Sequence, residues 1–237
     1  FLLFVGLTNA QPIVRLQPIL HRPSSHQEFP VANPVAWGIT DTLTLPFFED
    51  FAHDMGYPKE SRWTDNLVWV NNSFPKKAPN YGVATFDHLD AHGNPYNTLD
   101  KRVMVFADSL TSQPINLQFK RVGNQTINYK PTDSIYISFF IQRQGIGDAP
   151  EIEDSLFLYF KNIDNEWVRT WGIAGGFVGD FTEYFVAIAS YDYLIPNFQF
   201  RFVNYTKATG NLNHWHLDYI RIEKNRKAGE KTIQDVG

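Results

Sequence analysis

The chain has 237 residues and a formal net charge of −4, and it contains 20 Phe, 11 Tyr and 6 Trp but no Cys. The negative charge and the absence of a basic run argue against a nucleic-acid partner. The absence of cysteine excludes a disulfide-stapled domain, and a single β domain of this length buries roughly 70% of its unfolded surface without one.

The first ten residues are expected to be a clipped signal peptide. An apolar run from Phe1 to Leu7 precedes Thr8 and Ala10, which are the small residues of a cleavage site before Gln11. This run is too short to cross a bilayer, which needs ~20 residues. No later segment is long and apolar enough to be transmembrane in the mature chain. We therefore expect an exported protein; a buried first strand is the alternative interpretation of residues 1–10.

Two further segments lack a core pattern. Residues 11–42 carry five prolines between Pro12 and Pro34 and are expected to form an extended N-terminal arm. Residues 224–237 begin with the basic stretch Lys224 to Lys227 and are expected to start a linker to a further C-terminal region.

The segment between them, residues 43–223, is predicted to be all-β. Apolar residues alternate with other residues over 135–141, 156–160, 181–189, 198–203 and 215–220. This two-residue period is typical of strands that bury one face, and no stretch of ten residues shows the 3.6-residue period of an amphipathic helix. Strands at this spacing indicate an antiparallel sandwich or a barrel.

The order of aromatic and acidic residues resembles the jelly-roll modules of the MAM type. The domain opens with Leu-Pro-Phe-Phe-Glu-Asp-Phe at residues 45–51, has tryptophans at 63 and 69, and closes with Trp-His-Leu-Asp-Tyr-Ile at 215–220. The opening and the close also look like those of large secreted proteins of the Bacteroidota that are cargo of type IX secretion. The resemblance implies a two-layer antiparallel β-sandwich with jelly-roll (MAM/concanavalin-like) topology at the cell surface.

A structural calcium site is predicted at Glu49, Asp50 and Asp218. The resemblance implies that the first and last strands lie side by side, so that an ion could bridge them. Calcium takes 6–8 oxygen ligands from carboxylates and carbonyls, and a carboxylate among apolar strand residues needs a partner. The alternative is that Asp218 pairs with Arg201, Arg221 or backbone donors.

A weaker metal candidate is the loop 87–96, with Asp87 and Asp90 as its carboxylates. His88 and His92 lie in the same loop, but the spacing matches neither an EF-hand nor a His-Glu-x-x-His zinc motif. The alternative, a solvated turn capped by its own Asx side chains, is the more common use of such residues.

Three aromatic residues are predicted to lie on loops and to bind a ligand. They are Trp63, Tyr191 and Tyr193. Exposed tyrosine and tryptophan mark interfaces because one part of each side chain is apolar and the other is polar.

The predicted function is a non-catalytic extracellular or cell-surface module for binding or adhesion, part of a larger secreted bacterial protein. Its partners would be a glycan or a cell-surface protein, together with the secretion machinery. One alternative is a secreted glycosidase-like hydrolase or its accessory domain, with carboxylate candidates at Glu151, Glu153 and Glu183. The other is an accessory subunit of an outer-membrane secretion or gliding apparatus, which would present a flat apolar patch.

Overall fold

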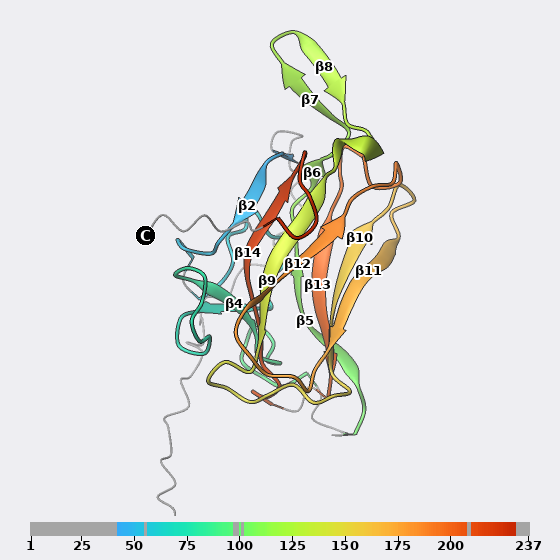
Figure 1. Ribbon diagram of the computed structural model, residues 1–237. Helices are drawn as coiled ribbons and strands as arrows, with labels where there is room; N and C mark the ends of the chain where they lie inside the picture. The colour runs from blue at the N-terminus through green and yellow to red at the C-terminus, as the bar shows by residue number, and fades with distance from the viewer. Residues whose placement is uncertain (1–41, 55, 97–99, 101, 208–209, 231–237) are drawn as a thin grey trace, which may run out of the picture.

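The computed structural model describes residues 42–54, 56–96, 100, 102–207 and 210–230 (Figure 1). Over these residues the chain forms fourteen strands and one short 3-10 turn, η1 (Pro131–Asp133), and no α-helix. No helix in this part of the chain is long and apolar enough to cross a membrane. The predicted signal peptide and nearly all of the predicted arm lie outside the described residues.

Two antiparallel sheets pack face to face, which confirms the predicted two-layer β-sandwich with jelly-roll topology (Figure 1). The four-stranded sheet has the order β11 (Trp167–Ala174), β10 (Ser155–Lys161), β13 (Phe200–Thr206) and β5 (Val105–Thr111). The six-stranded sheet has the order β12 (Thr182–Ala187), β9 (Tyr136–Arg143), β14 (Trp215–Glu223), β4 (Val83–Phe86) and β3 (Trp69–Asn71), while β2 (Phe47–Glu49) also pairs with β14.

Two small pairings lie outside the main sheets. β1 (Leu43–Thr44) pairs in parallel with β6 (Ile115–Asn116). β7 (Phe119–Val122) and β8 (Gln125–Asn128) form a hairpin that projects away from the sandwich (Figure 1). Gly123 in its turn has a φ of +58°, a conformation that glycine adopts without steric cost.

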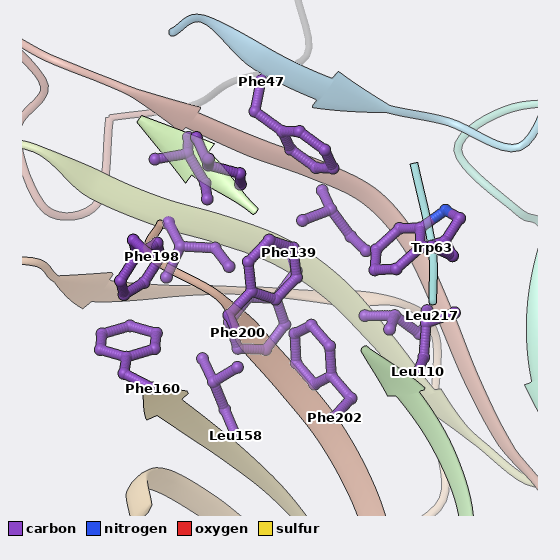
Figure 2. Packing of buried hydrophobic residues seen from close by; sticks show 14 of the residues in the cluster. Phe47, Trp63, Leu110, Phe139, Leu158, Phe160, Phe198, Phe200, Phe202 and Leu217 are labelled. Carbon is purple, nitrogen blue, oxygen red and sulfur yellow. The ribbon is translucent and has the colours of Figure 1, made fainter. Parts of the chain in front are cut away.

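The core lies between the two layers and is rich in aromatic rings (Figure 2). Alternation along β10 and β13 points Leu156, Leu158, Phe160, Phe200 and Phe202 inward, and all five are fully buried. Phe139 of β9 meets Phe202 edge to face, with ring centroids 4.8 Å apart. Such T-shaped pairs add to the stabilisation from buried area, so the phenylalanines of the two sheets hold the layers in register.

The last strand, β14, is central to the larger sheet. One side of it pairs with β9, while on the other side Trp215 to Leu217 pair with β4 and Ile220 to Ile222 pair with β2. The register shifts between Asp218 and Arg221, and Tyr219 has a φ of +53°. This irregularity lets one strand change neighbours, because a bulge bends the strand locally.

Candidate functional site

The structure places Glu49 beside the last strand, opposite Ile220 of β14. Its carboxylate accepts hydrogen bonds from the backbone N–H of Phe51 (2.9 Å) and from Trp63 Nε1–H (3.2 Å), and Arg62 Nε lies 3.6 Å away. Burial raises the pKa of Glu49 more than these contacts lower it. Both oxygens of Glu49 are therefore engaged by the protein itself.

Asp218 is fully buried at the bulge of β14. Its Oδ1 accepts a hydrogen bond from the backbone N–H of Tyr219 at 2.6 Å, while Oδ2 has no partner at ordinary hydrogen-bond geometry among the residues that the structure describes. Burial raises the pKa of Asp218 well above its usual value, and the charges of Asp50 and Glu49 raise it further, against the opposing effect of the backbone N–H groups of Tyr219 and Asn80. Asp50 and Glu49 therefore lie close enough to Asp218 to affect its ionisation.

Of the alternative partners expected for Asp218, the structure shows a backbone donor but neither arginine. The backbone donor is present in Tyr219, but Arg221 binds Glu223 and Arg201 donates to Thr111. Across the described ranges, no cluster of three or more His, Asp or Glu side chains is arranged to hold a metal ion.

In the loop 87–96 the two carboxylates bind backbone groups of the loop. Asp90 Oδ1 accepts hydrogen bonds from the N–H groups of His92 (2.8 Å) and Asn94 (2.9 Å). Asp87 is buried, and its Oδ1 accepts from the N–H of Leu89 at 3.2 Å. These are the Asx contacts of a capped turn.

The prediction that Trp63 is an exposed ligand-binding residue is wrong. Trp63 is only 2% exposed and stacks on Phe51 with centroids 5.9 Å apart, while Phe47 and Phe200 meet it edge to face. Its one polar group is satisfied by Glu49. A large ring with this many aromatic neighbours belongs to the core, although it lies outside the named strands.

The two tyrosines share a turn but differ in exposure. Tyr191 is 66% exposed, whereas Tyr193 is half-buried and packs edge-on against Phe160, with centroids 5.3 Å apart. Burial raises the pKa of Tyr193, and the charge of Asp192 adds to the effect. Tyr191 is thus the one predicted aromatic whose ring is freely accessible.

A larger set of accessible rings lies on the outer face of the four-stranded sheet. Because Leu156, Leu158 and Phe160 point inward, the alternate residues of β10 point outward. The same holds on the neighbouring strands, and we call this surface the arginine–aromatic face. Its members are Phe106, Phe157, Tyr159, Trp167, Arg169, Arg201 and Tyr205.

One row of this face has a tyrosine between two arginines. Tyr159 of β10 is opposite Arg169 of β11 on one side and opposite Arg201 of β13 on the other. Directly opposed side chains on one face of an antiparallel pair have Cβ atoms ~5 Å apart. The three side chains therefore form a continuous strip across the sheet.

Both guanidinium groups lie over aromatic rings. The Arg169 guanidinium carbon is 4.9 Å from the centroid of Phe157, and that of Arg201 is 4.2 Å from the centroid of Trp167. Arg201 Nε also donates to Thr111 Oγ1 at 2.9 Å. In the described part of the chain neither arginine is in an ion pair with a carboxylate.

The arginine–aromatic face also includes the paired rings of Phe106 on β5 and Tyr205 on β13, and a groove. Phe106 is 58% exposed and lies 4.9 Å from Tyr205, centroid to centroid. A groove of about 370 Å³ runs between β10 and β11 and is lined by residues that include Phe157, Arg169 and Gly172. A Cβ atom at Gly172 would lie 2.7 Å from Phe157 Cδ1, so the glycine lets this ring lie against the strand.

Sequence analysis did not predict this face. Phe157 and Tyr159 were visible as residues of the alternating segment 156–160, but their partners on β11 and β13 depend on the pairing register. β11 also has a register shift opposite Leu158 and Tyr159, which changes which of its residues point outward. A single arginine among the aromatic residues of β11 and of β13 was the available signal.

Comparisons with known proteins give distant similarities only. No family model and no curated protein matches the sequence. Among solved structures, the arabinose-bound α-L-arabinofuranosidase MgGH51 matches at 10% identity and a TM-score of 0.41, over 74% of this chain and 25% of that chain. The chain thus spans about a quarter of the length of that enzyme.

Two shorter structures match over nearly their whole length. One is the module CBM27-1 of Caldicellulosiruptor saccharolyticus in complex with mannohexaose (15% identity, TM-score 0.41, 75% of this chain and 96% of that chain). The other is the xylan-binding domain CBM22-1 of Paenibacillus barcinonensis Xyn10C (10% identity, TM-score 0.32, 80% and 100%). The sugars named for these structures are ligands of those proteins, and similarity at such scores says nothing of a ligand here.

Proposed function

We propose that the protein is a non-catalytic module that binds glycan chains on the arginine–aromatic face. The observation that carries the proposal is the set of rings on an open strand surface, among them Tyr159, Phe106 and Tyr205. Aromatic rings bind the C–H faces of sugars through their apolar surface, while neighbouring polar groups bind the hydroxyls. An extended chain of sugars can lie along such a surface without entering a deep pocket.

The position of the rings within the fold supports this function. Phe157 and Tyr159 come from a strand whose inward side chains are fully buried in the core. A rigid sheet loses little conformational freedom when a ligand binds, because its side chains are already ordered by their neighbours. The groove beside β11 adds a concave edge to the otherwise flat surface.

The hydrolase alternative receives less support from the acidic residues. A retaining or inverting glycosidase needs two carboxyl groups that face each other across the sugar. Glu151 lies in the loop before β10, where Lys207 Nζ is 3.2 Å from its carboxylate, whereas Glu183 is on β12 of the other sheet, 4.0 Å from Arg226. Glu153 is exposed in the same loop as Glu151. The candidate carboxylates are thus divided between the loop before β10 and a strand of the other sheet.

The proposed function is tested by affinity electrophoresis of the 237-residue chain in gels that contain a panel of neutral and acidic polysaccharides. Tyr159→Ala should weaken retardation by about tenfold in affinity, because a stacked ring contributes on the order of 1 kcal/mol or more. Tyr81→Ala removes a ring that is 69% exposed elsewhere and is the control. Retardation of the wild type that is unchanged in Tyr159→Ala but lost in Tyr191→Ala would move the site to the predicted turn.

We also propose that a structural calcium ion binds where β2 meets β14. The support is Asp218 Oδ2, a buried carboxylate oxygen without a hydrogen bond of ordinary geometry in the described structure, beside a second acid, Asp50. A buried carboxylate in this setting takes up either a proton or a cation. Stabilisation of the folded protein by calcium distinguishes the cation-bound state from the protonated state.

A further inference from the structure

The outward side chains of the four-stranded sheet carry positive charge only. Arg169, Arg201 and Lys161 point outward from β11, β13 and β10, and no outward position of the four strands is acidic. The acid that reaches this surface is Asp65, which accepts hydrogen bonds from Ser109 Oγ and from the N–H of Thr111, both at 2.8 Å. This local charge contrasts with the net charge of −4 of the whole chain.

The arginines cover two of the rings that a neutral sugar would use. Arg169 lies over Phe157 and Arg201 lies over Trp167, at 4.9 and 4.2 Å from the ring centroids. A guanidinium group that lies over a ring still has N–H groups around its rim, and these can bind a carboxylate with two hydrogen bonds. The rings therefore act as supports that orient the arginines, rather than as free stacking platforms.

The two arginines belong to the strands on either side of Tyr159, and both side chains reach over the strand of that tyrosine, Arg169 toward Phe157 and Arg201 toward Trp167. Arg169 and Arg201 are both directly opposite this residue, so their Cα atoms are two strand spacings apart, roughly 10 Å. The contact from Arg201 Nε to Thr111 Oγ1 uses one donor and leaves the two terminal nitrogens. A chain of sugars that lies across Tyr159 would present its substituents to both arginines.

From this charge and geometry we infer that the arginine–aromatic face selects acidic glycans, chains that carry uronic-acid carboxylates, an inference that rests on the proposed glycan-binding function. Tyr159 stacks on a sugar ring, and Arg169 and Arg201 each bind a carboxylate through the terminal nitrogens. The face would bind acidic chains more tightly than neutral ones, because the two guanidinium groups add little affinity when the sugar has no carboxylate to bind them. Lys161, which lies opposite Trp167 in the adjacent row, adds a third positive charge.

The experiment measures binding of the 237-residue chain by isothermal titration calorimetry to polygalacturonate, alginate and hyaluronan. Each polymer is paired with its carboxyl-reduced form, which has the same backbone and no charge. At least one acidic polymer should bind about tenfold or more tightly than its reduced form, since charge-assisted bidentate contacts are roughly twice as strong as neutral ones. The difference should shrink as the salt concentration rises from 50 to about 500 mM.

Variants assign the effect to the face. Arg169→Gln and Arg201→Gln should each weaken binding of the acidic polymer about tenfold and leave binding of the reduced polymer within about twofold. Arg121→Gln is the matched control, because Arg121 also lies over a ring, that of Phe119, but on the projecting hairpin. The control variant should bind as the wild type does.

The outcomes separate this inference from the proposed function. Equal binding of acidic and reduced polymers, or normal acidic binding by both arginine variants, overturns the acidic specificity and leaves glycan binding intact. No binding to any polymer overturns both. If dextran sulfate binds more tightly than every uronate polymer, the group that the arginines recognise is sulfate and not carboxylate. If oligothymidylate binds equally well, the ligand is a single-stranded nucleic acid and not a glycan.

Discussion

The guanidinium carbon of Arg201 lies 4.2 Å from the centroid of the Trp167 ring, although the strands of these two residues do not pair. β10 runs between β13 and β11, so the two side chains meet over the residues of the intervening strand. The contact joins three strands on the outer side of the sheet, where no core packing does so. It also fixes the position of the Arg201 guanidinium group above the sheet surface.

A double-mutant cycle should detect coupling between Arg201 and Trp167. Arg201→Gln and Trp167→Leu, singly and together, are compared by urea unfolding, and we expect an interaction energy of about 0.5–1 kcal/mol, the usual size of an exposed cation–π pair. Additive effects would show that the two side chains merely lie near each other. Arg169 and Trp167 make no such contact in the described structure and give the control cycle.

The substitution Gly172→Ala should damage the groove with little loss of stability. The new methyl group would lie 2.7 Å from Phe157 Cδ1, so the ring must rotate away from β11. We expect the affinity for the bound polysaccharide to fall about threefold to tenfold while the unfolding free energy changes by less than about 1 kcal/mol, because the site is on the surface. Gly210→Ala, which lies outside the groove and has open space around an added Cβ atom, is the control in the same titration.

Three buried histidines make the protein sensitive to acid. Burial lowers the pKa of His88 to about 3, of His214 to about 4 and of His216 to about 3, and the charge of His214 contributes at His88 and His216. One ring nitrogen of His216 lies 2.9 Å from Thr85 Oγ1 and the other 3.2 Å from the carbonyl oxygen of Gln144, and this carbonyl raises the pKa of His216 less than burial lowers it. At these three residues the unfolded chain therefore binds more protons than the folded chain between about pH 3 and pH 6.5.

The sign of the pH effect follows from these lowered pKa values. The contribution of the histidines to stability is complete above about pH 6.5 and is lost as the pH falls toward 3–4, by up to about 1.4 kcal/mol per pH unit for each residue. Asp218 acts in the opposite direction, because its raised pKa favours the folded state at low pH. Unfolding in guanidinium chloride at pH 7.5, 6, 5 and 4 measures the combined effect of the histidines and Asp218 on the unfolding free energy.

His88→Leu isolates one histidine. Neither ring nitrogen of His88 has a hydrogen-bond partner among the described residues, and the side chain is fully buried. We expect the variant to gain about 1–2 kcal/mol at pH 7.5, because an unsatisfied buried polar group is removed. Its stability should also fall less steeply between pH 6 and pH 4, and a slope equal to that of the wild type would contradict the low pKa.

Calcium should stabilise the wild type through Asp218. We expect 1 mM calcium to raise the Tm by about 5–10 °C and a chelator to reverse the rise, since a ligand at 100 times its Kd contributes ~2.7 kcal/mol. Asp218→Asn should respond to neither, while Asp164→Asn, an exposed acid in a hairpin turn, should respond like the wild type. A wild type that ignores calcium, with Asp218→Asn equally or more stable, would show that the buried carboxyl holds a proton.

Trp63→Phe tests the correction from ligand-binding residue to core residue. The variant keeps an aromatic ring among Phe47, Phe51 and Phe200 but removes the donor to Glu49 Oε2. It should lose about 1–3 kcal/mol of unfolding free energy, the cost of a buried charged acceptor without its hydrogen bond. Polysaccharide affinity should not change, and a loss of affinity without a loss of stability would restore the original prediction.

The fold was predictable because its central strands have one buried face. The alternating segments 135–141, 156–160 and 215–220 coincide with β9, β10 and β14. The hairpin of β7 and β8 was not predicted, since its residues are largely exposed on both faces and show no apolar alternation. The MAM-like resemblance and type IX secretion remain predictions.

The site was predictable in part only. The proximity of Glu49 and Asp218 followed from the expected pairing of first and last strands, and the electrostatic effect of Glu49 on Asp218 agrees with it. The hydrogen bonds that the Glu49 carboxylate accepts from Trp63 and Phe51 could not be predicted, because they depend on where the chain after β2 folds back. The alignment of Arg169, Tyr159 and Arg201 in one row depends on a register shift between β10 and β11, and the amino-acid sequence does not reveal where such a shift occurs.

Because β14 lies at the centre of the larger sheet, this sheet can form only after β14 has been synthesised. Its neighbours β2, β4 and β9 are translated long before it, yet each of them pairs with β14, so the larger sheet stays incomplete until residue 223 has left the ribosome. Pairings this distant in sequence make folding slow, because the chain must close long loops first. Nascent chains that stall before residue 215 would expose the unpaired edges of β9 and β4, and such edges are where aggregation begins.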